Sequence, residues 1–104
     1  MGRYAQRRVA GGGPPPASLL TYMTAVTLTA FTTEGSITWN RTVDVSTLDP
    51  ANFVALPGGQ TAVTLTQNGA NGALVEYDDV VETSNSVRYN GHNTNFLTPQ
   101  TLHV

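Results

Sequence analysis

The sequence contains no cysteine and no lysine, and only 12% of its 104 residues are charged. Without cysteine, the chain has neither a disulfide cross-link nor a thiolate for metal binding or nucleophilic catalysis. No apolar run approaches the roughly 20 residues of a membrane-spanning helix, so a membrane is not an expected partner. The N-terminal segment lacks the apolar stretch of a signal peptide, which argues against export. Two histidines, His92 and His103, would need distant carboxylates to form a zinc site.

The few charges are segregated along the chain. Residues 1–18 contain three arginines and no acidic residue, which gives a net charge of +3. Residues 19–104 contain two arginines against seven acidic residues, a net charge of −5, so the whole chain carries −2. Salt screens attraction at long range, but a basic segment and an acidic body can still bind at contact distance. The pattern therefore favours contact between the basic segment of one copy and the body of a neighbour.

Residues 1–18 are predicted to form a flexible basic arm. Gly11–Gly13 favours flexibility, and Pro14–Pro16 favours an extended spacer. Three interpretations remain open: a disordered tail or cloning remnant, an assembly arm that orders on a partner, and a nucleic-acid contact. Segments that bind nucleic acid usually interleave several aromatic residues with basic ones, and three arginines alone make a weak case for phosphate binding. Nucleic acid is therefore not the expected partner. The assembly interpretation assigns partner binding to Arg3, Tyr4, Arg7 and Arg8.

Residues 19–104 have the composition of one all-β domain. Thr, Asn, Val, Ala and Gly are frequent, and this mixture favours strands and turns over helices. Alternating apolar residues and turn dipeptides predict about seven short strands, typical of a β-sandwich, with a small barrel as the alternative. The predicted strand regions are Leu19–Phe31, Ile37–Val45, Phe53–Leu56, Thr61–Gln67, Ala73–Asp78, Ser86–Asn90 and a last short strand after Pro99.

Several local features are predicted in the first half of the domain. Glu34–Ser36 is typical of a turn. Trp39 is expected in the core, and the strand that carries it should break near Arg41, because an arginine is rarely buried. Ser46 is expected to cap a single helical turn that Pro50 ends.

In the second half, the alternation sets which side chains point inward. Val63 and Leu65 are expected to face the core from one strand. Asn68-Gly69 and Asn71-Gly72 are hairpin-turn dipeptides. In the strand that follows, one buried face is predicted for Ala73, Val75 and Tyr77, with Val80 and Val81 extending the strand after a kink.

The stretch Ile37–Phe53 resembles a signature of bacterial Ig-like domains. The shared elements are an apolar strand, the turn Val43-Asp44-Val45-Ser46-Thr47 and the ending Ala51-Asn52-Phe53. Asp44 and Ser46 can bond the local backbone in such a turn. The resemblance implies an Ig-like β-sandwich over residues 19–104, with Phe53 closing one end of the core.

A stand-alone Ig-like module with a basic, Gly/Pro-rich arm resembles the accessory structural proteins of tailed-bacteriophage particles. That resemblance implies a non-catalytic virion protein of the head, neck or tail that docks on a major capsid or tail protein. The arm would lock neighbouring copies, so a homo-oligomer and a location in the virion are expected. The alternative is a bacterial cell-surface or secreted Ig-like module that binds carbohydrate or protein.

Glu76, Asp78, Asp79 and Glu82 form the acidic cluster of the sequence. Three interpretations remain open: a solvated strand edge, a docking patch for a basic arm, and a calcium site in which Glu76 and Asp78 share one strand face. Paired carboxylates also serve glycosidases, but a domain this small offers no evident cleft, and no Gly-x-Ser-x-Gly elbow is present. We therefore expect no enzyme activity, no cofactor and no metal.

Overall fold

The computed structural model describes residues 19–104, so the predicted arm of residues 1–18 lies outside the described residues. These residues form strands and two single-turn 3₁₀ helices, with no α-helix among them. The strands are β1 (Met23–Leu28), β2 (Glu34–Trp39), β3 (Phe53–Leu56), β4 (Gln60–Gln67), β5 (Gly72–Tyr77), β6 (Ser86–Tyr89) and β7 (Gln100–His103). The 3₁₀ helices are η3 (Val45–Thr47) and η4 (Pro50–Asn52).

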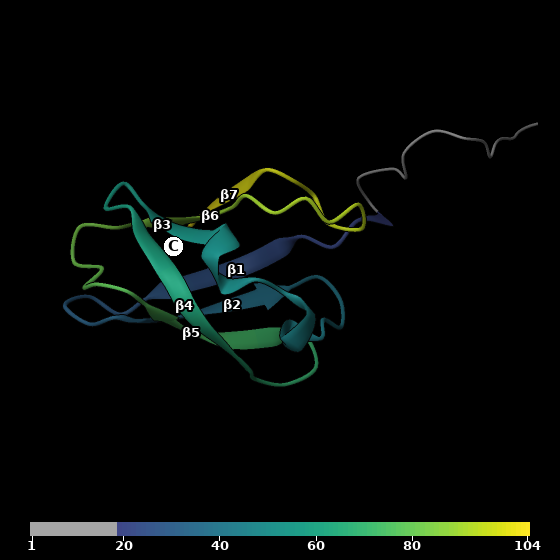
Figure 1. Cartoon of the computed structure of the whole chain (residues 1–104), viewed down its shortest axis with the longest axis horizontal. Coiled ribbons are helices and arrows are strands. Elements are labelled where there is room, and N and C mark those ends of the chain that lie inside the picture. The colour runs from purple at the N-terminus through teal and green to yellow at the C-terminus, as the bar shows by residue number, and fades with distance from the viewer. Residues whose placement is uncertain (1–18) are drawn as a thin grey trace, which may run out of the picture.

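All seven strands belong to one antiparallel sheet with the order β1-β2-β5-β4-β3-β6-β7 (Figure 1). Strand β4 joins the two halves of the sheet, because its start pairs with β3 and the rest pairs with β5. The sheet curls until β1 approaches β7, where a bridge links Thr21 to Phe96 and the Gln100 side chain bonds Met23. The all-β class is confirmed. The Ig-like sandwich is not confirmed, because the strands form one nearly closed sheet, nearer to a small barrel.

A row of aromatic rings fills the interior of the curled sheet. Trp39 from β2 meets Phe53 from β3 edge-on, with 6.1 Å between ring centroids. Phe53 stacks at a tilt on Tyr89 at 4.9 Å, and Tyr89 on Phe96 at 5.4 Å. Such pairs add about 0.5–1.5 kcal/mol each beyond the area they bury. The prediction that Trp39 belongs to the core is confirmed, since 1% of its surface is exposed.

The predicted break after Trp39 is also confirmed. Strand β2 ends at Trp39, and Arg41 is exposed, while Val43 and Val45 return to the core. The predicted single helical turn is wrong at both ends, because the segment forms two 3₁₀ helices and Pro50 begins the second of them. Asp44, and not Ser46, caps η3, because its carboxylate accepts a hydrogen bond from the Ser46 backbone N–H at 3.1 Å.

The predicted turn at Glu34–Ser36 is wrong, because these residues begin β2 and the turn lies at residues 29–33. Glycine in a strand often marks a close approach between backbones. A Cβ atom on Gly35 would collide with the carbonyl oxygen of Thr27 on β1. Gly35 therefore permits strand pairing here and does not form a turn.

The predicted inward direction of Val63 is wrong. The register of β4 against β5 shifts between Ala62 and Thr64, as in a β-bulge. The extra residue changes the phase of the alternation, so Ala62 is buried and Val63 is 56% exposed. Leu65 packs against the core as expected.

The alternation predicted for β5 is confirmed, since Ala73, Val75 and Tyr77 are all buried. Val80 and Val81 do not extend the strand, which ends at Tyr77. Val81 is buried in the loop that follows, and its N–H donates to the Thr32 carbonyl at 2.9 Å.

Candidate docking surface

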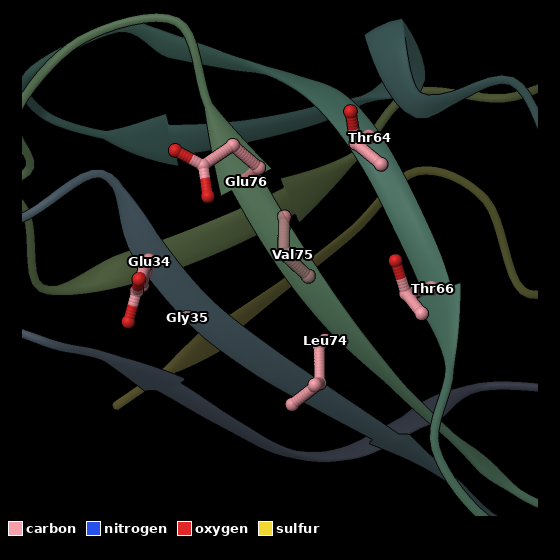
Figure 2. Close-up of a pocket in the computed structure, with 7 residues that line it drawn as sticks. All are labelled: Glu34, Gly35, Thr64, Thr66, Leu74, Val75 and Glu76. Atoms are coloured by element: carbon pink, nitrogen blue, oxygen red, sulfur yellow. The ribbon is translucent and has the colours of Figure 1, made fainter.

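A concavity of about 460 Å³ lies on the outer face of β2, β4 and β5 (Figure 2). Thr64 and Thr66 of β4 line one side, and Leu74 of β5 lies near the middle with 52% of its surface exposed. Glu34 of β2 and Glu76 of β5 line the other side. The surface thus combines an apolar centre, hydroxyl groups and two carboxylates.

The two glutamates face each other across neighbouring strands. Glu34 and Glu76 are direct partners in the antiparallel register of β2 and β5. The Thr33 hydroxyl donates to a Glu76 carboxylate oxygen, and the Thr32 hydroxyl accepts from the Glu34 backbone N–H at 3.0 Å. Glu34 was absent from the acidic cluster predicted from sequence, because strand pairing, and not sequence proximity, brings it to Glu76.

Two loops meet beside this concavity and form what we call the tip: residues 29–33 and residues 78–85. The Val81–Thr32 hydrogen bond described above and a 2.7 Å bond from the Tyr77 N–H to the Thr33 carbonyl join the two loops. Two apolar side chains of the tip face solvent, Phe31 with 76% of its surface exposed and Val80 with 37%. Phe31 has a φ of 63°, in the left-handed region that non-glycine residues rarely adopt.

The predicted acidic cluster is divided between these surfaces. Glu76 lies on the outer face of β5, whereas Asp78, Asp79 and Glu82 are exposed in the tip. The predicted shared strand face of Glu76 and Asp78 is wrong, because β5 ends at Tyr77. Asp78 instead accepts a hydrogen bond from the Thr61 N–H at 3.0 Å, and Asp79 accepts one from the Val80 N–H at 2.8 Å. These two carboxylates therefore order the tip.

The described residues offer no assembled metal site. No group of three or more His, Asp or Glu side chains in residues 19–104 is placed to hold an ion. His92 is exposed in the loop before β7, and His103 is exposed at the end of β7. The predicted partner-binding residues Arg3, Tyr4, Arg7 and Arg8 lie outside the described residues.

Two tyrosines are the buried titratable groups behind this face. Burial raises the pKa of Tyr77 to about 12, and among the described residues its hydroxyl finds no hydrogen-bond partner. Burial also raises the pKa of Tyr89, although a hydrogen bond with the Asn93 backbone lowers it in part. Both hydroxyls are therefore neutral near pH 7, and neither tyrosine lines the concavity.

No protein-family model, curated protein or solved structure matches this chain. The resemblance to bacterial Ig-like domains therefore stays a prediction from the stretch Ile37–Phe53. Within residues 19–104, no helix has the length and apolar character needed to cross a membrane.

Proposed function

We propose that the chain is a non-catalytic structural module that docks on a multi-copy protein assembly. The sequence resemblance implies a tailed-bacteriophage virion as the setting, where the module decorates the head or completes the neck or tail. Its partners are then a major capsid or tail protein and further copies of itself.

Phe31 is the observation that carries the docking role. Its aromatic side chain is 76% exposed, and its backbone lies at a φ of 63°. A left-handed conformation costs a non-glycine residue about 1–2 kcal/mol, and residues strained in this way cluster at ligand clamps and binding sites. An exposed aromatic side chain also gains nothing from burial until a partner covers it. Buried aromatic anchors contribute most of the binding energy in many protein interfaces.

The surroundings of Phe31 supply the other parts of an interface. Val80 is a second exposed apolar side chain of the tip, and Asp78, Asp79 and Glu82 give the tip negative charge. Charges at the rim of an interface select the partner and its orientation more than they add affinity. Repetition of the contact over many copies then provides avidity. The mechanism is adhesion, in which an apolar partner pocket with a basic rim receives Phe31.

The setting is tested by fractionating the native source on a density gradient and locating the chain by mass spectrometry. We expect the chain to co-sediment with phage-sized particles and to resist a salt wash. Recovery with the cell envelope or in the culture medium would overturn the virion proposal in favour of the cell-surface or secreted alternative.

The role of Phe31 is tested by rebinding purified full-length chains to particles from which the chain has been removed. Phe31→Asn tolerates the left-handed backbone but lacks the aromatic ring, so we expect binding to fall at least about tenfold. Leu19→Asn is the matched control, because Leu19 is 61% exposed and precedes β1, whereas Phe31 follows this strand. Equal binding by the two variants would remove Phe31 from the interface.

A further inference from the structure

The Glu34–Glu76 pair places two acidic residues at directly opposite positions of neighbouring strands. The Tyr77 N–H donates to the Thr33 carbonyl, so residues 33 and 77 form a hydrogen-bonded pair. Such pairs alternate with non-hydrogen-bonded pairs along an antiparallel ladder, and the next pair is Glu34–Glu76. Side chains approach most closely in non-hydrogen-bonded pairs, with Cβ atoms about 4.5–5.5 Å apart, and like charges there destabilise the sheet.

The strands that carry the pair bring no positive charge to it. β2, β4 and β5 contain neither lysine nor arginine. In residues 19–104, the arginines are Arg41, beyond the far end of β2 from Glu34, and Arg88, in β6 of the other half of the sheet. The Thr33 hydroxyl donates to Glu76, but these strands bring no cation to the pair, so a cationic partner on this face would offset the repulsion that remains.

The concavity beside the pair suits an arginine side chain. A guanidinium group is planar and presents five donors, which lets it bond two carboxylates at once. Its aliphatic stem can lie on the exposed part of Leu74, and the hydroxyls of Thr64 and Thr66 line the opposite wall (Figure 2). Lysine would supply charge without this shape, and the chain contains no lysine.

The chain carries a matching segment in residues 1–18. This segment contains Arg3, Arg7 and Arg8 and no acidic residue, whereas residues 19–104 have a net charge of −5. Charge complementarity thus points to the chain itself as the source of the cation.

The length of the segment favours docking between copies. Leu19 precedes β1 and the turn that leads to Glu34 follows β1, so the two lie at opposite ends of this strand. Strand rise puts them roughly 30 Å apart, and the eleven residues from Arg8 to Leu19 span at most about 36–40 Å. Docking within one copy would use about three quarters or more of this span and would need the chain to reverse direction before β1. Docking on a second copy needs neither.

We propose that residues 1–18 of one copy dock in this concavity on a second copy, with an arginine of the Arg7–Arg8 pair bonded to Glu34 and Glu76. The proposal deepens the docking role proposed above by naming a second copy as partner. The contact is head-to-tail, because each copy offers a segment and a receptor on different surfaces. Such contacts form open chains or closed rings, the smallest ring being two copies that exchange their segments.

Sedimentation velocity of the purified full-length chain tests this contact without any particle. We expect the wild type to grow into larger species as its concentration rises and to dissociate as salt is added. Glu34→Gln/Glu76→Gln and Arg7→Gln/Arg8→Gln should each sediment as monomers, with association weakened at least about tenfold. An equimolar mixture of these two double variants should form a dimer and nothing larger, because one supplies only the segment and the other only the receptor.

Asp44→Asn/Asp49→Asn is the matched control, since it removes the same charge away from both the tip and the concavity, and asparagine keeps the oxygen that caps each 3₁₀ helix. This variant should associate like the wild type. Three results would overturn the proposal: a wild type that stays monomeric at every concentration, a mixture that forms no dimer, and association lost in the control but kept in Glu34→Gln/Glu76→Gln. Each of them leaves the particle-binding test of Phe31 unaffected, so the two proposals can fail separately.

Discussion

The side-chain amide of Gln100 forms two hydrogen bonds with the backbone of Met23. Its Oε1 accepts from the Met23 N–H at 2.8 Å, and its Nε2 donates to the Met23 carbonyl at 2.9 Å. Gln100 belongs to β7 and Met23 to β1, the two outermost strands of the sheet order. The amide therefore acts as a peptide group of a neighbouring strand and joins the two edges. Gln67 repeats this arrangement, accepting from the Val45 N–H at 3.1 Å and donating to the Val43 carbonyl at 2.9 Å.

Gln100→Ala should destabilise the fold by about 1–3 kcal/mol, because both part-buried backbone groups of Met23 lose their partner. Urea denaturation measures the free energy of unfolding, and hydrogen exchange should show faster exchange at the Met23 amide. Thr101→Ala is the control on the same strand, since the Thr101 side chain is exposed. If the two variants are equally stable, the contact between the edge strands β1 and β7 does not depend on the Gln100 amide.

Gly35→Ala should destabilise the fold by about 1–3 kcal/mol, since a Cβ atom would force β1 away from β2. The comparison is Gly59→Ala, where a Cβ atom would meet nothing within 4 Å but the φ of 85° is unfavourable for alanine. That variant should lose about 1 kcal/mol through backbone strain alone. Thermal or urea unfolding measures the stability of the two variants. If Gly35→Ala loses less stability than Gly59→Ala, the close approach of Thr27 to Gly35 is contradicted.

The sequence predicted those parts of the fold that depend on neighbouring residues in the chain. The alternation in β5 identified Ala73, Val75 and Tyr77 as buried because a strand repeats every two residues. The direction of Val63 could not be obtained in this way, because the bulge that turns it outward depends on the pairing of β4 with β5. Gly35 was misread for a similar reason, since the backbone that comes close to it belongs to another strand.

The docking surface shows the same limit. The predicted acidic cluster grouped residues close in sequence, whereas the structure divides them between the concavity and the tip. Glu34 and Glu76 are 42 positions apart and meet through the register of β2 and β5. Turn signals predict strands but do not predict which strands pair, so this pair was not visible in the sequence. The exposure of Phe31 was also hidden, because an aromatic residue next to a strand is usually part of the core.

Tyr77→Phe should leave stability unchanged or raise it by up to about 1 kcal/mol, because the buried hydroxyl has no partner among the described residues. Tyr89→Phe is the matched control, since it removes a hydroxyl that bonds the Asn93 backbone. The free energy of unfolding of Tyr89→Phe should be about 1 kcal/mol lower than that of the wild type. Urea denaturation at pH 7 measures the free energy of unfolding of both variants. A clear loss of stability in Tyr77→Phe would reveal a hydrogen bond to the Tyr77 hydroxyl in solution.

Alkaline pH should weaken the wild type more than Tyr77→Phe. Burial raises the pKa of Tyr77 from 10.0 to about 12. In the unfolded chain this hydroxyl ionises near its ordinary pKa, so between pH 10 and 12 the folded state keeps a proton that the unfolded state has lost. The contribution of the Tyr77 hydroxyl to the free energy of unfolding is therefore fully present below pH 10, and it decreases as the pH rises through this window. Urea denaturation at a series of pH values from 9 upward should show the wild type losing stability faster than Tyr77→Phe, in which the contribution of Tyr89 is retained. Equal pH dependence in the two proteins would mean that the Tyr77 hydroxyl ionises as readily in the folded state as in the unfolded chain.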